Sequence, residues 1–313
     1  QKKVTLDKCP YVSDDAKGAL ESAAEPPIRL VTIGTGDNKV ELGNETVMFR
    51  HDEKFYHPTA ISFLVEDTET EDDIKKAVSE IKQLNFERVG QKISVNLVVL
   101  KGSQGDESKF LKALNVILQG IELPVVLLND NTDTLKKALD ICKDKKPLIG
   151  FCTESNLDKM TELANSNKVP VIVSAESLEA LAGLVQKVKG KSVKDIILYT
   201  GEKSISKKIW DLTEIRRMAI KKSFRPFGFP TLVFSIEEDL FQEAASAASF
   251  VAKYAGICVM KHRLPWQVLS VLTARQNIFT DPQKPLQVEP KVYPIGNVTK
   301  ESPILVTTNF SLT

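Results

Sequence analysis

Polar side chains that could do acid–base chemistry follow a series of short apolar runs in this sequence. They occur as Glu66-Asp67, Lys101-Gly102-Ser103, Asn129-Asp130, Cys152-Thr153-Glu154, Ser174-Ala175-Glu176, Tyr199-Thr200-Gly201-Glu202, Ser235-Ile236-Glu237 and Lys261-His262-Arg263. Carboxylates and imidazoles exchange protons near neutral pH, so His262 is a candidate general base. Acidic residues at these places also suit the positive amino end of a following helix. We favour the structural role over catalysis.

Motifs that bind metals or nucleotides do not complete this pattern. His51 and His57 are close in sequence, but no cysteine is near enough to form a zinc site with them. Residues 34–38 lack the third glycine and the helix start of a dinucleotide-binding turn. Residues 101–106 could hold an anion on their amides, which is a weak signal. The apolar runs contain no conspicuous lysine. Residue types alone therefore identify no active site.

The apolar runs alternate with segments of helical period. Residues 125–128 suit a strand buried on both faces, and residues 132–142 repeat apolar side chains at the spacing of an amphipathic helix. The strand–helix unit occurs eight times: 60–65 with 71–84, 93–100 with 107–119, 125–128 with 132–142, 147–151 with 155–165, 171–173 with 176–188, 195–198 with 203–221, 231–234 with 238–254, and 257–260 with 265–277. Eight consecutive units predict an α/β fold, a (β/α)8 TIM barrel rather than an open sheet.

Three segments are expected along the chain. Residues 1–27 form a leader with a short helix over 16–24. Residues 28–277 hold a small antiparallel β meander and then the barrel. The meander has strands at 28–33, 39–42 and 46–49, joined by Gly and Asn turns, and is expected to cover one end of the barrel. Residues 278–313 contain five prolines up to position 303 and form an extended arm that ends in the start of a strand at 304–306. The chain begins at Gln1, so we expect a piece of a longer protein.

Composition limits the partners. Lys+Arg is 42 against Asp+Glu 41, so no basic field that could bind nucleic acid is expected. The apolar runs are far shorter than the roughly 20 residues that span a bilayer, so no membrane insertion is expected. The four cysteines are spread without pairing motifs, which indicates a reducing, cytoplasmic environment. We expect Cys142, Cys152 and Cys258 to be buried and unreactive.

Specific sequence matches lie near both ends of the chain. Residues 6–13 place Cys9 directly before Pro10 and Tyr11, and the chain closes on residues 306–313, Val-Thr-Thr-Asn-Phe-Ser-Leu-Thr. Further matches lie at 24–29, 32–36, 47–51 and 55–56. Together they resemble the large subunits of corrinoid iron–sulfur proteins over nearly the whole chain. Similar barrels occur in related subunits of the archaeal acetyl-CoA decarbonylase/synthase complex.

This resemblance implies an N-terminal 4Fe–4S domain, a central barrel and a C-terminal corrinoid domain. The family's cluster ligands follow C-x₂-C-x₄-C-x₁₆-C, and Cys9 matches the fourth of them. A cluster of this kind needs four thiolates, and three would lie upstream of Gln1. The corrinoid domain would begin around residues 303–313. The resemblance thus implies a barrel with a stub of each neighbour. Thr307, Thr308 and Thr313 could then contact the corrinoid, or could simply belong to a strand and turn.

The family's function is methyl transfer in the reductive acetyl-CoA pathway. A methyl group from methyltetrahydrofolate is taken up on the corrinoid cobalt through a separate methyltransferase and passed to acetyl-CoA synthase. The partner is a small subunit, itself a barrel, and the large-subunit barrel is expected to be a heterodimerisation scaffold without catalytic residues. The alternative from another class is a pterin-binding methyltransferase barrel, with Asn96, Asn129 and Asp130 as its polar candidates. A purely structural barrel is a third, weaker hypothesis.

Overall fold

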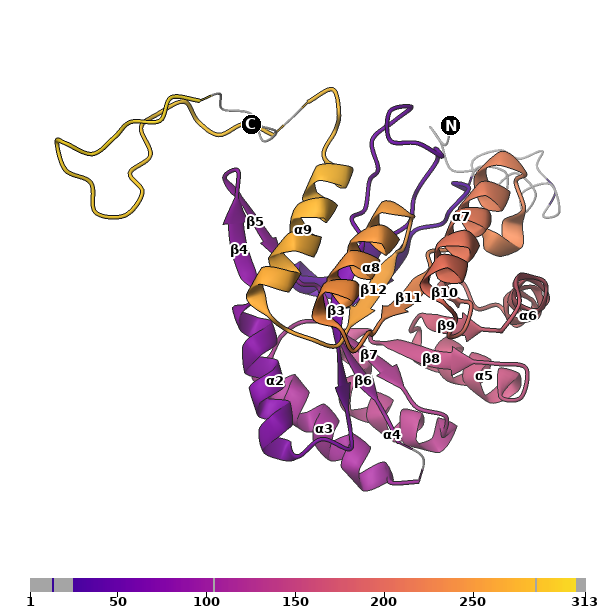
Figure 1. Cartoon of the computed structure of the whole chain (residues 1–313). Helices are drawn as coiled ribbons and strands as arrows, with labels where there is room; N and C mark the ends of the chain where they lie inside the picture. Colours follow the sequence, from indigo (N-terminus) through magenta and orange to yellow (C-terminus); the bar gives the residue numbers. More distant parts are fainter. Residues whose placement is uncertain (1–12, 14–24, 104, 285, 308–313) are drawn as a thin grey trace.

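Eight parallel strands form a closed ring, and α-helices surround it (Figure 1). The computed structural model describes residues 13, 25–103, 105–284 and 286–307. The strands are β3 (Ala60–Glu66), β6 (Leu97–Lys101), β7 (Val125–Leu128), β8 (Leu148–Cys152), β9 (Val171–Ser174), β10 (Ile196–Tyr199), β11 (Leu232–Ser235) and β12 (Ile257–Met260). Seven lateral pairings run β10-β9-β8-β7-β6-β3-β12-β11. A parallel bridge from Leu198 to Thr231 closes the ring. The predicted barrel is confirmed.

Eight helices follow the eight strands in the described part of the chain. They are α2 (Glu71–Gln83), α3 (Glu107–Gly120), α4 (Thr132–Cys142), α5 (Leu157–Asn167), α6 (Leu178–Gly190), α7 (Ile205–Lys221), α8 (Leu240–Ala252) and α9 (Pro265–Phe279). Side-chain caps fix several starts. Asn131 accepts from the amides of Asp133 and Thr134, and Ser177 accepts from that of Ala180. None of these helices is long and apolar enough to cross a membrane.

Two apolar layers hold the barrel together. Alternate strand residues such as Leu64, Val99 and Val126 fill the inside of the ring. The residues between them pack outward against the helices in a much larger cluster, which includes Phe63 and Phe110. This alternation explains why the strands read as continuous apolar runs.

A short hairpin covers the amino-terminal ends of the strands. It consists of β1 (Val31–Ile33) and β2 (Val40–Leu42), whose four buried valine, isoleucine and leucine side chains join the cluster inside the ring. The Gly34 amide donates to the Lys146 carbonyl, just before β8. The expected cover is therefore confirmed. The third strand expected at 46–49 is wrong. That segment forms no ladder, and the carbonyl of Val47 accepts from the Arg216 guanidinium instead.

The strand expected at 93–100 is two strands with different roles. β4 (Asn85–Arg88) and β5 (Gln91–Ser94) form an antiparallel hairpin outside the barrel, and β6 follows it. Val89 and Gly90 both have positive φ, as the turn of a tight hairpin requires. Asn96 separates β5 from β6. Its side-chain oxygen accepts from the Ile61 amide at 3.1 Å and from Arg275.

An extended arm leaves the carboxyl end of α9 (Figure 1, yellow). Its described residues beyond 280 form no helix and no extended strand. Ile304, Leu305 and Val306 are each more than four-fifths exposed. The strand expected at 304–306 is therefore wrong, because no strand in the described part of the chain pairs with these residues. The helix expected at 16–24 lies outside the described residues.

Candidate functional site at the carboxyl ends of the strands

Aromatic side chains close the centre of the barrel at the carboxyl ends of its strands, the end that we call the mouth. Phe151 stacks on Tyr199 with ring centroids 4.9 Å apart, and Phe234 meets Tyr199 edge-on at 5.4 Å. These residues end β8, β10 and β11, so three strands contribute to one lid over the ring's interior. The Tyr199 hydroxyl donates to Glu202 at 2.6 Å. Burial and this carboxylate raise the pKa of Tyr199, so its phenol stays protonated.

A buried lysine ties helix α7 to the same edge. The Lys208 ammonium donates to Glu202 at 2.7 Å and to the Phe234 carbonyl at 2.9 Å, and the residue is only 5% exposed. Sequence reasoning missed it because it looked for lysines on the strands. The available signal was its place on the inward stripe of α7, four residues before Leu212.

The loop after β12 is organised by a buried carboxylate. Glu243 of α8 is fully buried. Its carboxylate accepts from the Lys261 backbone amide at 2.7 Å, from the His262 ring at 2.9 Å and from the side-chain amide of Gln267. His262, the candidate general base, is therefore oriented by a carboxylate through Nδ1. This arrangement suits proton transfer, and it equally suits a structural role in holding the loop in place. Glu243 was not singled out by the sequence, because it occupies one position in an otherwise apolar and small-residue helix.

A polar hollow of about 390 Å³ lies beside the mouth, between the ends of β6 and β7. Gly102, Ser103 and the Asn129–Asp130 pair line it, together with the first residues of α4 and Lys159. The Asn129 side chain accepts from the Asn131 amide, and its nitrogen packs against Gly102, where a Cβ would lie 2.1 Å away. Glycine at position 102 is thus required for Asn129 to fit.

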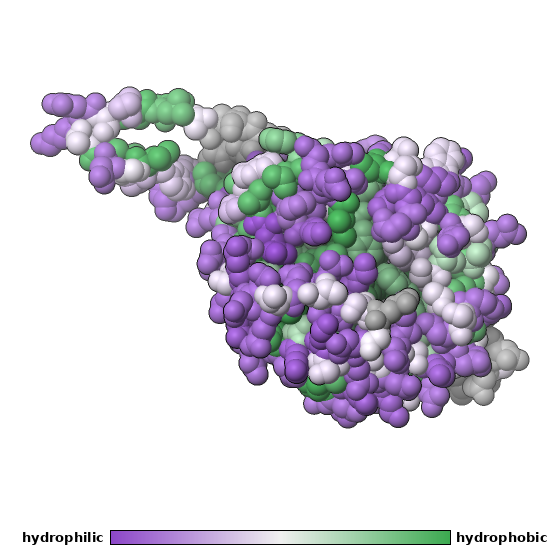
Figure 2. All heavy atoms as spheres, turned by 60° about the horizontal axis from the view of Figure 1, so that its bottom comes forward, coloured by the Kyte–Doolittle hydropathy of each residue, from purple (hydrophilic) through white to green (hydrophobic). Residues whose placement is uncertain are grey.

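Asp67 supports the hollow from the end of β3. One of its carboxylate oxygens accepts from the Ser103 amide at 2.8 Å. Its other oxygen is buried and has no hydrogen-bond donor among the residues that the structure describes. A buried acceptor without a donor is energetically costly, so Asp67 has unused hydrogen-bonding capacity beside the hollow. The face at the mouth is largely hydrophilic, with apolar atoms visible within it (Figure 2).

Asn96 does not belong to this site. It precedes β6, at the amino end of the barrel, whereas Asn129 and Asp130 follow β7 at the carboxyl end. Its side chain is also engaged by Ile61 and Arg275. The grouping of Asn96 with Asn129 and Asp130 is therefore wrong. The error followed from treating residues 93–100 as a single strand.

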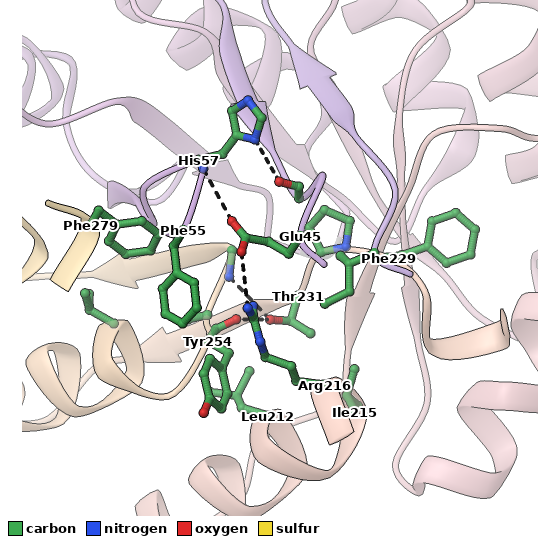
Figure 3. A pocket seen from close by; sticks show the side chains of 16 residues that line it. Glu45, Phe55, His57, Leu212, Ile215, Arg216, Phe229, Thr231, Tyr254 and Phe279 are labelled. Carbon is green, nitrogen blue, oxygen red and sulfur yellow. Dashed lines mark hydrogen bonds and ion pairs between the residues drawn. The ribbon is translucent and has the colours of Figure 1, made fainter. Parts of the chain in front are cut away.

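A second, small cavity of about 40 Å³ lies at the amino end of the barrel (Figure 3). Arg216 of α7 donates to Glu45 at 3.1 Å and stacks over Phe55 and Tyr254, with distances of 4.6 and 4.5 Å to the ring centroids. Glu45 also accepts from the Tyr56 and His57 amides. These contacts fasten the segment over residues 43–57 to the barrel. The cavity is too small for a cofactor. It lies where this segment packs against the barrel and has a structural role.

The described residues do not fit an iron–sulfur cluster. Cys142, Cys152 and Cys258 are buried in α4, β8 and β12, and burial raises the pKa of the first two thiols to about 12 and that of Cys258 as well. They are inert thiols, as expected. In this part of the chain no three His, Cys, Asp or Glu side chains are grouped to hold a metal. Cys9 lies outside the described residues.

The three threonines considered for corrinoid contact lie at the very end of the chain. Thr307 is exposed on the arm. Thr308 and Thr313 lie outside the described residues. The structure therefore does not test their predicted role.

Comparison with solved structures agrees with the fold. A dihydropteroate synthase from Thermus thermophilus is similar over 78% of this chain and 97% of its own, with a TM-score of 0.55 and 13% sequence identity. One from Coxiella burnetii has a TM-score of 0.54 over 73% of this chain and 96% of its own, also at 13% identity. At this level of identity the likeness concerns the barrel alone.

Comparison with protein sequences identifies the family. Residues 30–313 match the family described as the CO dehydrogenase/acetyl-CoA synthase delta subunit. The corrinoid/iron-sulfur protein large subunit of Moorella thermoacetica is 42% identical over 99% of this chain and 70% of its own length. The acetyl-CoA decarbonylase/synthase complex subunit gamma of Methanothermobacter thermautotrophicus is 34% identical over 100% of this chain and 71% of its own length. The chain therefore belongs to the family of corrinoid/iron–sulfur protein large subunits and acetyl-CoA decarbonylase/synthase gamma subunits.

Proposed function

We propose that this chain is the barrel-bearing part of a methyl carrier of the acetyl-CoA pathway. The carrier takes a methyl group from methyltetrahydrofolate through a methyltransferase and passes it to acetyl-CoA synthase. Family membership supports this role. A corrinoid and a 4Fe–4S cluster would be the cofactors, held largely by parts of the protein outside residues 28–277.

Within that carrier the barrel is a heterodimerisation scaffold for the small subunit. The observation that carries this assignment is the closed mouth. Phe151, Tyr199 and Phe234 fill its centre, and the lysine beside it, Lys208, is paired with Glu202. A catalytic mouth would need groups that are free to meet a substrate. The names of the relatives, which are subunits of larger proteins, support a partner for this chain.

The segments that flank the barrel take the cofactor-related roles in this proposal. Residues 1–27 are the end of the cluster domain with its linker, and Cys9 is one cluster ligand. Residues 278–313 are a linker and the start of the corrinoid domain, with Thr307, Thr308 and Thr313 as corrinoid contacts. The exposed arm, which leaves the barrel at α9, is consistent with such a linker. In the longer protein, replacing Cys9 with serine should lower the cluster's visible absorbance, whereas replacing buried Cys142 with alanine should not.

The polar hollow favours one competing function, a pterin-binding methyltransferase barrel. It has a volume of about 390 Å³ and is lined by Asn129, whose side-chain oxygen accepts from the Asn131 amide. Its ligand would sit beside Asn129 and Asp130, without Asn96.

Titration calorimetry of the chain with methyltetrahydrofolate separates the two functions. The scaffold predicts no saturable heat at ligand concentrations up to the millimolar range. Micromolar binding that Asn129→Ala weakens, and that Asn115→Ala on α3 leaves unchanged, would contradict the scaffold and establish the enzyme. Asn115 is the control because its amide bonds only to the Leu111 carbonyl of its own helix.

A further inference from the structure

Basic side chains gather at the amino end of the barrel, near the point where the leader joins it. Arg29 lies just before β1, Lys189 lies in the last turn of α6, and Arg225 begins the short 3-10 turn between α7 and β11. This turn packs against both α6 and α7. Lys221 is the last residue of α7, and Lys222 follows it. We call these five residues the basic cluster.

One carboxylate among the described residues pairs with this cluster. Glu25 accepts from Nε of Arg29 at 2.5 Å. The Nη1 atom of Arg29 is buried and has no acceptor in the described part of the chain. Arg225 donates to the backbone carbonyls of Glu25 and Pro26, at 3.3 and 3.4 Å. The cluster therefore has more positive charge than the described carboxylates neutralise.

The three lysines of the cluster lack a counter-charge in the part of the chain that the structure describes. The ammonium groups of Lys189, Lys221 and Lys222 form neither a hydrogen bond nor an ion pair with described residues. Desolvation lowers the pKa of Lys189, and the guanidinium groups of Arg29 and Arg225 lower it further, with a partial offset from the nearest carboxylate. The carboxyl ends of helices favour lysines, which explains their positions but supplies no carboxylate. Cations crowded in this way attract an anionic partner.

The segment that directly precedes Glu25 has the complementary charge. Residues 14–24 contain three acids, Asp14, Asp15 and Glu21, against the single Lys17, so their formal net charge is −2. A segment of opposite charge that is covalently joined to the chain beside the cluster is the partner that the sequence itself supplies.

The spacing of the acids continues a contact that the structure already shows. Glu21 stands four residues before Glu25, which is about one turn of the helix expected over residues 16–24. Glu25 is bound to Arg29 of the cluster. Glu21 is therefore the next carboxylate on the same helical face.

The covalent link compensates for the weakness of exposed ion pairs. Such pairs are individually weak in water. Four residues span at most about 14 Å, so Glu21 stays close to the cluster in any conformation of the leader. A short tether of this kind gives an effective concentration in the millimolar range or above.

We propose that residues 14–24 dock on the basic cluster through their carboxylates, with Glu21 beside Lys189 and Lys222. The proposal goes beyond the proposed function, because it concerns how the leader is fastened to the barrel and holds whatever precedes residue 13. Docking there directs the leader across the ends of α6 and α7, at the amino end of the barrel and away from the mouth.

Hydrogen exchange of the backbone amides of residues 14–24, followed by mass spectrometry, tests the proposal. In the parent chain these amides should exchange slowly at about 0.05 M salt and at least about tenfold faster at about 0.5 M salt, where exposed charges are screened. The double variant Lys189→Glu/Lys222→Glu should exchange at least about tenfold faster at low salt. Lys253→Glu is the matched control, because Lys253 follows the end of α8 as Lys222 follows that of α7, and its effect should stay below about twofold.

A charge swap separates direct pairing from a general effect of charge. Glu21→Lys alone should speed exchange, and Glu21→Lys combined with the double variant Lys189→Glu/Lys222→Glu should restore slow exchange. The same spectra report the amides of the barrel helices, whose unchanged exchange shows that each variant is folded.

Three results would overturn the proposal. Fast exchange of residues 14–24 in the parent chain at both salt concentrations means that the segment does not dock. Slow exchange that neither salt nor the double variant changes means that other contacts hold it. A charge swap that stays fast means that Glu21 does not pair with these lysines. If the segment exchanges fast while polyglutamate binds the parent chain and not the double variant, the cluster serves an acidic surface of another protein instead.

Discussion

Arg216 joins the segment over residues 43–57 to helix α7 through a buried ion pair with Glu45. Both side chains are less than a tenth exposed, and the guanidinium also contacts the rings of Phe55 and Tyr254. Desolvation lowers the pKa of Arg216, and the Glu45 carboxylate acts in the opposite direction. Removing the carboxylate would leave a buried cation without a counter-charge, since its other partners are the Val47 carbonyl and the two aromatic rings.

Glu45→Ala is therefore expected to destabilise the chain by about 3–5 kcal/mol, because it removes the counter-charge of Arg216 and the acceptor of two backbone amides. The free energy of unfolding in urea measures this loss. Glu154→Ala, which removes an exposed ion pair with Lys187, is the control and should change stability by less than about 1 kcal/mol. Equal effects of the two variants would show that the buried pair is not what holds the segment.

Cys142 predicts a specific dependence of stability on alkaline pH. Its pKa is raised by burial to about 12 in the folded chain, whereas an exposed thiol titrates near about 8.5. Its contribution is fully present below about pH 8.5 and is lost as the pH rises toward 12, because only the unfolded chain releases the proton. The stability advantage of the parent chain over Cys142→Ala should thus fall by about 2 kcal/mol between pH 8 and pH 10. A constant difference in unfolding free energy would contradict the buried, protonated thiol.

Some functional-looking residues could be predicted from the sequence and others could not. Asn129 and Asp130 follow a short apolar run, and the structure places them at the mouth as expected. Lys208 and Glu243 were missed because their burial depends on which face of a helix meets the barrel edge. Asn96 was misplaced because a hairpin of ordinary composition precedes β6.

At the level of elements, repetition made the barrel predictable. β7, α4 and β12 have the predicted bounds, since each is a compact apolar run or a clear helical period between turn formers. The hairpin β4–β5 and the missing third strand of the meander depend on long-range bonds from Arg275 and Arg216, which local pattern does not reveal.

The two ends of the β1–β2 hairpin come close together at Gly43, which follows β2 and lies against the backbone of Arg29 before β1. A Cβ there would lie 2.0 Å from the Arg29 carbonyl oxygen, and φ is +85°. Gly36 also has positive φ but open space around it.

Gly43→Ala should therefore lower the free energy of unfolding by at least about 3 kcal/mol, and Gly36→Ala by only about 1 kcal/mol. Urea denaturation of both variants measures the difference between a steric clash and backbone strain alone. Similar losses for the two would mean that the backbone at Gly43 can move away from Arg29.

At the scale of the whole molecule, three features agree with the proposed scaffold. The mouth is closed by Phe151, Tyr199 and Phe234, the amino end is covered by a hairpin, and the outer surfaces of α8 and α9 expose no charged side chain. The arm leads from α9 away from the barrel (Figure 1). These features together suit a scaffold that holds a partner on one side and a tethered segment at its end.

Sedimentation velocity of the chain, alone and mixed with the small subunit of a corrinoid iron–sulfur protein, tests the scaffold most directly. The account predicts a monomer for the chain alone and a single faster-sedimenting 1:1 complex in the mixture at micromolar concentration. Two species that sediment independently at every ratio would contradict it.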